Sequence, residues 1–165
     1  MKEIRIKREL AGEWYAFIVT ESECKTSCSL IRKKIVGIDV GINNFVYDSD
    51  NHVIEHPRIL RKSEKKLKKI QRRLSRKIKG SANRWKQKIK LAKIHQKVKN
   101  QRNDFLHKTS RYYINNYDTI FVEDLKIQNM IKNHHLAKSI SDSSWNSFFQ
   151  KLEYKAERAV FCFPK

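Results

Sequence analysis

One short stretch, residues 35–41, constrains the fold more than any other part of the chain. It reads IVGIDVG, so it is apolar except for a single carboxylate, Asp39, which stands between two glycines. An apolar run of this length is typical of a strand buried on both faces of a sheet. A carboxylate inside such a strand is costly unless a cation or hydrogen-bond donors meet it. We therefore predict a central strand with Asp39 as a metal ligand, and the alternative is an Asp that caps a turn at the strand end.

Shorter strands are predicted on both sides of this stretch. Residues 2–20 alternate between apolar and charged side chains, which is typical of a β-hairpin. Residues 44–47 and 52–55 have strand character as well. We interpret the polar residues 21–34 as a linker between the hairpin and the main sheet.

Two carboxylates, Asp48 and Asp50, stand in the turn between the last two of these strands. They invite comparison with a calcium loop, but the Gly-x5-Glu continuation of that pattern is missing. We interpret both as turn residues, because Asp side chains commonly accept hydrogen bonds from nearby backbone in turns.

The segment 61–111 is strongly basic and nevertheless has a helical pattern. It holds 21 Lys and Arg residues against two acidic ones. The spacing of Leu67, Ile70, Leu74 and Ile78 predicts a helix with its start at Ser63. The pattern breaks around Gly80 and resumes at Trp85. These features predict two long antiparallel helices, an αα-hairpin closed at Gly80.

Many like charges in this segment lie four residues apart, as Lys65 and Lys69 do, and each such pair destabilises a helix by a few tenths of a kcal/mol. We infer that the lysines and arginines bind phosphates, and the alternative is a solvated basic face. The net charge of +20 favours a polyanionic partner as well. No apolar run of membrane-spanning length or signal peptide is expected. The candidate phosphate contacts on the hairpin are Lys66, Lys69, Arg72, Arg73, Arg76, Lys77, Arg84, Lys88 and Arg102.

A second buried strand is predicted at residues 120–122, and it ends in Glu123 and Asp124. A strand reached through a helical crossover is expected to lie parallel to the earlier one. If the two are neighbours, Glu123 lies about 4.8 Å, one strand spacing, from Asp39 or a residue beside it. Two carboxylates this close repel unless a cation lies between them, and Mg²⁺ suits oxygen ligands. The alternative for Glu123 is an ordinary strand-end charge, and we expect Asp124 on the opposite face.

The three cysteines, Cys24, Cys28 and Cys162, form no disulfide framework and are suited to a reducing cytosol. A zinc site at Cys24 and Cys28 is not expected, because no second Cys or His pair is near them in the sequence.

Several motifs together resemble one known family. They are VGIDVGINNF, KSEKKLKKIQRRLSRK, NQRNDFLHKTSR, YDTIFVEDLKI and KNHHLAKSISDSSWNSFFQKLEYKAERA. They are similar to the transposase-B (TnpB, OrfB) family of insertion sequences, which is related to RNA-guided type V CRISPR nucleases. The resemblance runs from about residue 35 to residue 159.

The resemblance implies a mixed α/β fold, an RNase H-like (RuvC) sheet with the long basic helical hairpin inserted. Asp39 matches the family's first catalytic Asp and Glu123 its catalytic Glu, and both hold Mg²⁺ for phosphodiester hydrolysis. The implied partners are DNA and a guide RNA in a prokaryotic cytoplasm. Residues 1–34 resemble the last strands of the family's N-terminal β-barrel domain, together with a linker, and residues 35–165 resemble its nuclease domain.

The sequence departs from the family pattern after residue 159. The family's third catalytic Asp and its zinc ribbon have no counterpart, so we expect a truncated copy that binds Mg²⁺ weakly and cleaves little. We interpret Asp142 as a helix cap rather than a catalytic substitute. Glu153 and Glu157 share a helical face and could approach a metal, but surface charge is the commoner role of such residues.

Three interpretations remain open. His134 and His135 diverge on any regular backbone, so we read their segment as a loop that carries nucleic acid near the active site, or as a plain connector. The whole chain is expected to be a nuclease fragment, and the first alternative is a non-catalytic nucleic-acid-binding module. The second is an actin-like ATPase, but there a Thr or Ser should follow the second glycine, where Ile42 stands here.

Overall fold

The computed structural model describes residues 3–20, 34–132 and 136–159. Its contacts divide the chain into two compact units. One unit contains residues 1–24 and 59–102, and the other contains residues 25–58 and 103–165. The contacts therefore group the basic hairpin with the N-terminal strands, whereas the division expected from the sequence, at residues 34 and 35, stays a prediction.

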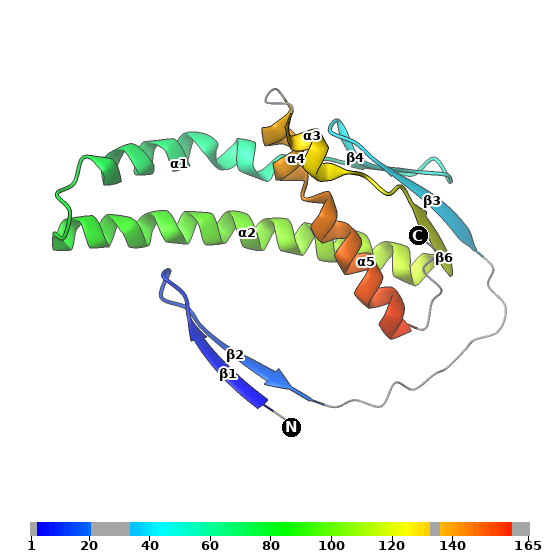
Figure 1. The fold of residues 1–165 in the computed structure, drawn as a ribbon, viewed down its shortest axis with the longest axis horizontal. Helices are drawn as coiled ribbons and strands as arrows, with labels where there is room; N and C mark the ends of the chain where they lie inside the picture. Colours follow the sequence, from blue (N-terminus) through cyan, green and yellow to red (C-terminus); the bar gives the residue numbers. More distant parts are fainter. Residues whose placement is uncertain (1–2, 21–33, 133–135, 160–165) are drawn as a thin grey trace. The chain divides into compact units, whose positions relative to one another are not determined.

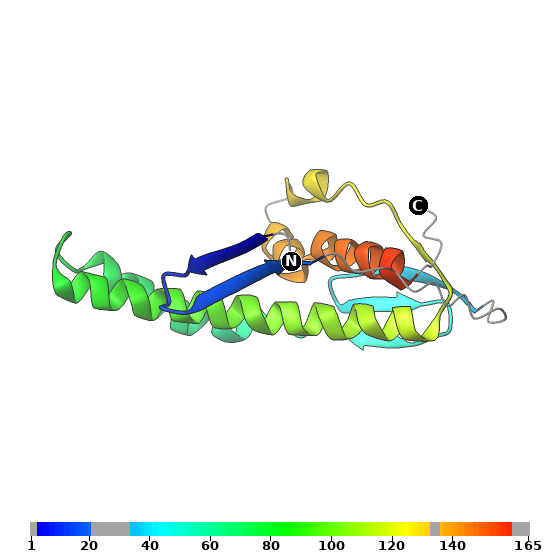
Figure 2. The same ribbon diagram turned by 90° about the horizontal axis from the view of Figure 1, so that it is seen from below.

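The first unit begins with a two-stranded antiparallel sheet. Strands β1 (Glu3–Arg8) and β2 (Trp14–Val19) pair from Glu3 opposite Val19 to Arg8 opposite Trp14. Gly12 has a φ of 97° in the connecting turn, a left-handed conformation that glycine adopts without strain. The alternating pattern therefore correctly predicts this hairpin (Figure 2).

One helix and the first part of a second follow in the same unit, and Figure 1 shows the two helices running antiparallel. Helix α1 (Ile59–Ser75) and helix α2 (Ala82–Asn116) flank a turn in which Gly80 has a φ of 84°, which confirms the predicted closure. The predicted start at Ser63 is wrong, because α1 already begins at Ile59, after the positive φ of Arg58.

The apolar stripe of α1 is shorter than its spacing suggests. Leu67 is buried, and Ile70 and Leu74 are half-buried. Ile78 lies in the turn and is 80% exposed, so its predicted place in the stripe is wrong. Helix α1 ends at Ser75, where the Ser75 hydroxyl donates to the Arg72 carbonyl and competes with continued helical bonding.

The second unit is organised around a four-stranded mixed sheet with the order β5-β4-β3-β6. Strands β3 (Ile35–Val40), β4 (Asn44–Asp48) and β5 (Val53–Glu55) form an antiparallel meander. Strand β6 (Thr119–Val122) lies parallel to β3 at the other edge. The parallel neighbour predicted for the first strand is therefore confirmed, and the chain is a mixed α/β protein.

One face of this sheet carries the core of the unit. Val36, Ile38 and Val40 are buried on β3, whereas Ile35 and Asp39 are exposed on its other face. The prediction that this strand is buried on both faces is therefore wrong, because the described helices cover only one face. The core also contains apolar residues from β4, β6, three helices and the short link before β6: Phe45, Val46, Leu106, Tyr113, Ile114, Tyr117, Ile120, Ile140, Trp145, Phe148, Leu152 and Ala156.

Three further helices complete the unit: α3 (Ile127–Ile131), α4 (Ala137–Ser143) and α5 (Trp145–Ala159). Both views show α5 lying against the C-terminal part of α2 (Figure 1 and Figure 2). Asp142 lies inside α4, so the prediction that it caps the following helix is wrong. Among the helices of the described residues, none is long and apolar enough to cross a membrane.

Candidate functional site

The two carboxylates singled out in the sequence, Asp39 and Glu123, follow the parallel register of β3 and β6. Ile38 pairs with Val122, and continuing this register by one residue places Asp39 opposite Glu123. Glu123 is the first residue after β6, which ends at Val122, and both side chains are exposed. Neighbouring strands lie about 4.8 Å apart, so the two carboxylates can share one cation.

The surroundings of this carboxylate pair are open. Gly37 lies on the same face, opposite Phe121, and a Cβ atom built on Gly37 would meet no atom within 4 Å. On the other side Asp39 is opposite Tyr47 of β4, whose hydroxyl donates to Asn51 Oδ1 at 2.9 Å. The exposed face therefore offers room for a ligand above two carboxylates, and oxygen ligands of this kind suit Mg²⁺.

A third acidic ligand for this pair is not brought in by the described part of the chain. Within residues 3–20, 34–132 and 136–159, no three His, Cys, Asp or Glu side chains form a group that could hold a metal. Glu153 of α5 does line a cavity of about 190 Å³ together with Glu123. Asp124, which we expected on the opposite face from Glu123, lines this cavity too. Glu157 is exposed on α5.

The turn carboxylates Asp48 and Asp50 accept hydrogen bonds both from the turn itself and from two distant tyrosines, and the sequence predicts only the turn contacts. Asp48 is 1% exposed, and its Oδ1 accepts the backbone N–H groups of Asp50 and His52 at 3.0 and 2.9 Å. Its Oδ2 accepts the Tyr113 hydroxyl at 3.0 Å. The Asp50 carboxylate accepts the Tyr117 hydroxyl at 2.8 Å. The turn role is confirmed; Asp48 also binds Tyr113 of α2, and Asp50 binds Tyr117, the residue directly after this helix.

Burial of Tyr113 and its bond to Asp48 raise the pKa of this phenol well above its ordinary value. The pKa of Tyr117 is raised for the same reasons, burial first and then the hydrogen bond to Asp50. Both carboxylates are thus acceptors for neutral phenols within the protein. This arrangement explains Asp48 and Asp50 without a metal ion.

The basic residues of α1 form a hollow on one side of this helix, which we call the α1 hollow. Its volume is about 540 Å³, and it is lined by Lys65, Lys68, Lys69, Arg72, Arg73 and Arg76. Four of the predicted phosphate contacts therefore lie together. Lys66 and Lys77, also predicted, are exposed but line no part of the hollow.

The remaining predicted contacts have different surroundings. Arg84 Nη1 donates to the carbonyls of Leu74 and Lys77 at 3.1 and 2.8 Å, so part of this side chain holds the turn between α1 and α2. Lys88 Nζ lies 5.6 Å from the centroid of a Trp85 ring. Arg102 is half-buried. The predicted nucleic-acid contacts His134 and His135 lie outside the described residues.

Comparisons with known proteins identify the family. A family model described as "Probable transposase" matches residues 19–134. A protein of Streptomyces pristinaespiralis named "Putative RNA-guided DNA endonuclease" is 38% identical over 152 residues, which are 92% of this chain and 37% of that protein. Escherichia coli (strain K12) has "Putative RNA-guided DNA endonuclease InsQ", 36% identical over 159 residues, 87% of this chain and 39% of that protein.

The chain thus spans about two fifths of the length of these curated relatives. The family match covers well over half of the chain and includes both Asp39 and Glu123. This chain therefore belongs to the transposase family of insertion sequences that its motifs resemble.

Proposed function

We propose that the chain is part of a transposon-encoded, RNA-guided DNA endonuclease with an RNase H-like core. The observation that carries the proposal is the parallel pairing of β3 with β6, whose register, continued by one residue beyond Ile38 and Val122, brings Asp39 opposite Glu123. Support also comes from the names of the relatives, which are RNA-guided DNA endonucleases. The mixed sheet, with three antiparallel strands and a fourth parallel to the first, is consistent with an RNase H-like core.

In this proposal Asp39 and Glu123 hold Mg²⁺ on the exposed face of the sheet. Bound magnesium supplies activation of the attacking water and stabilisation of the leaving oxygen in phosphodiester hydrolysis. The open space above Gly37 admits the phosphodiester. The α1 hollow binds other phosphates of a DNA or RNA strand, because six cationic side chains line it.

We further propose that this chain alone binds nucleic acid but cleaves it weakly or not at all. Mg²⁺ requires near-octahedral oxygen coordination, and two carboxylates leave most positions to water. The competing function, a non-catalytic binding module, rests on the same α1 hollow and needs no metal. An actin-like ATPase has no support from the family membership.

Metal binding is tested first with Mn²⁺ as a paramagnetic substitute for Mg²⁺, followed by amide NMR. Mn²⁺ should broaden the signals of residues around Asp39 and Glu123, and Asp39→Asn should abolish the broadening. Asp104→Asn is the matched control, since this exposed carboxylate pairs with Lys108 on α2. Broadening that persists in Asp39→Asn would rule out the assigned ligands.

Cleavage is tested with a labelled single-stranded DNA in the presence of Mg²⁺. Any cleavage by the wild-type chain should disappear in Asp39→Ala, and cleavage that survives this substitution comes from a contaminant. Binding of the DNA should be largely retained in Asp39→Ala, because Asp39 does not line the α1 hollow and is not one of the proposed basic phosphate contacts. Binding without metal-dependent cleavage in every variant would favour the binding module.

A further inference from the structure

A second basic site lies wholly within the unit that contains the mixed sheet. It is a cavity of about 670 Å³ between the end of α2 and α5, which we call the α2–α5 cavity. A histidine, two lysines and an arginine are among its lining residues, and none of the described lining residues is acidic. The lining residues are His107, Lys108, Arg111, Tyr112, Asn115, Asn116, Tyr154 and Lys155.

The most unusual of these side chains is Lys155, which is only 6% exposed. Its Nζ atom donates to the His107 carbonyl at 2.9 Å and to Ser110 Oγ at 2.7 Å. Both acceptors are neutral, and an ammonium group has three donors, so among the described residues one Lys155 donor remains for a further acceptor. A buried charge without a counter-ion is costly. An anion in the cavity would offset that cost.

The electrostatic surroundings of Lys155 point the same way. Burial lowers the pKa of Lys155, and the charges of Arg111 and Lys151 lower it further. The pKa of His107 is lowered by burial and by Lys151 and Lys155. Several positive charges therefore lie close together, and Asp104 only partly opposes the lowering of the His107 pKa. Lys108 contributes less, because its Nζ pairs with Asp104 at 2.8 Å.

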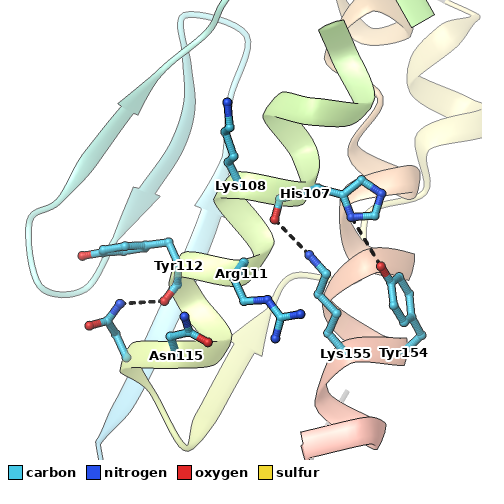
Figure 3. Close-up of a pocket in the computed structure, with 8 residues that line it drawn as sticks. His107, Lys108, Arg111, Tyr112, Asn115, Tyr154 and Lys155 are labelled. Carbon is cyan, nitrogen blue, oxygen red and sulfur yellow. Dashed lines mark hydrogen bonds between the residues drawn. The ribbon is translucent and has the colours of Figure 1, made fainter. Parts of the chain in front are cut away.

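The donors converge on one space. In Figure 3 the Arg111 guanidinium extends from α2 towards Lys155 on α5. Tyr154 stands beside them with its hydroxyl 3.4 Å from His107 Nδ1. A guanidinium and an ammonium on facing helices suit the oxygens of a phosphate, because the guanidinium can bind two of them in parallel.

We propose that the α2–α5 cavity binds a backbone phosphate of a nucleic-acid strand, with Arg111 and Lys155 as its principal contacts. The inference rests on the proposed function and extends it to residues that belong neither to the carboxylate pair nor to the α1 hollow. Arg111 can form two parallel hydrogen bonds to the phosphate, and Lys155 supplies the third donor.

The test measures binding of a fluorescein-labelled oligothymidylate by anisotropy at several salt concentrations. Arg111→Gln and Lys155→Met should each weaken binding several-fold at low salt. The slope of log K against log[salt] should fall by about 0.7 for each single-strand phosphate contact that is lost. Lys34→Gln removes the same charge from an exposed residue of this unit that already pairs with Asp50, and it should leave the slope unchanged.

Folding is checked by circular dichroism for each variant. If Lys155→Met unfolds, Arg111→Gln still decides the question, because Arg111 is exposed and can lose its charge without opening the core. A wild-type slope in Arg111→Gln would overturn the proposal and leave the proposed function intact. Failure of the wild-type chain to bind the oligonucleotide would overturn both.

Inorganic phosphate distinguishes a strand phosphate from a free anion. The His107 ring resonances should shift on oligonucleotide binding, and phosphate at millimolar concentration should shift them only weakly. Tight saturation by inorganic phosphate, combined with unchanged oligonucleotide binding in Arg111→Gln, would make the cavity a free-anion site and contradict the proposal.

Discussion

At the residue scale, Asp48 shows how one buried carboxylate can hold two distant segments together. Three donors reach it, namely the N–H groups of Asp50 and His52 and the hydroxyl of Tyr113. Because the carboxylate is fully satisfied, its burial is tolerated. Removing the carboxylate leaves these donors unpaired in the core, and removing one donor weakens the set.

We predict that Asp48→Ala lowers the free energy of unfolding by about 3 kcal/mol, because the substitution leaves buried hydrogen-bond donors without an acceptor. Tyr113→Phe should cost about 1 kcal/mol, the net value of one hydrogen bond. Urea unfolding of each variant measures both. Asp50→Ala is the control. Among the described residues, its carboxylate accepts the Tyr117 hydroxyl and forms a 3.7 Å ion pair with Lys34, so its effect should be clearly smaller. Equal losses for Asp48→Ala and Asp50→Ala would contradict this account.

The same contacts predict a loss of stability in alkali. Tyr113 keeps its proton in the folded protein because its pKa is raised, whereas the unfolded chain releases that proton near the ordinary value of 10.0. The unfolded state then binds fewer protons, so the free energy of unfolding should fall as the pH rises above about 10. Urea midpoints between pH 8 and pH 11 test this, and Tyr113→Phe should flatten the decline. If stability falls as steeply with pH in Tyr113→Phe as in the wild-type chain, the loss of stability comes from another group, such as Tyr117.

The sequence allowed the parallel pairing of β3 with β6 to be predicted, because a helical crossover favours it, whereas the metal site at Asp39 and Glu123 stays a prediction. It could not reveal the bond from Tyr113 to Asp48, because the two residues are 65 positions apart and neither has a distinctive local pattern. It also could not indicate that Ile35 and Asp39 are exposed, since an apolar run does not reveal which sheet face its neighbours cover.

At the element scale, α1 combines an apolar stripe with a dense row of like charges. Its spacing predicted the helix, but the start at Ile59 was missed because Ser63 offered a plausible cap inside the real helix. Glu64 is the acidic residue of α1, and it pairs with Lys68 at 2.6 Å. Elsewhere along the α1 hollow the charges repel, so binding and helix stability should respond oppositely to charge reversal.

We predict that Lys69→Glu stabilises α1 while it weakens binding to an oligonucleotide. The new carboxylate would meet Lys65 and Arg73 at four-residue spacing, and each such pair is worth about 0.2–0.5 kcal/mol. Thermal melting and anisotropy measure the two effects. Lys62→Glu is the control, because it gains a similar partner in Lys66 but lies outside the α1 hollow. A loss of binding no larger in Lys69→Glu than in Lys62→Glu would contradict the role of the hollow.

At the scale of the whole molecule, the described helices cover one face of the mixed sheet and leave the other, which we call the bare face, uncovered. Ile35, Tyr47, Val53 and Phe121 are all exposed, and their registers place them on the face that carries Asp39. Exposed apolar groups of this size favour association with other surfaces.

The bare face should make the chain bind hydrophobic dyes and self-associate at high concentration. Phe121→Thr should reduce both, because it removes a large exposed ring while retaining strand propensity. Dye fluorescence and light scattering are the measurements. Ile78→Thr is the control, since Ile78 is even more exposed but lies in the turn after α1. An equal reduction in the control would attribute the association to overall apolar surface rather than to the sheet.

Helix α2 is a continuous run of 35 residues, and the boundary between the two compact units falls within it, after Arg102. Its backbone hydrogen bonds therefore cross from one unit into the other without interruption. If either half of the helix unfolded, the other half would gain a frayed end with backbone carbonyl or amide groups that lack hydrogen-bond partners. Thermodynamic coupling follows from this shared backbone, so calorimetry should record one transition whose measured and van't Hoff enthalpies agree.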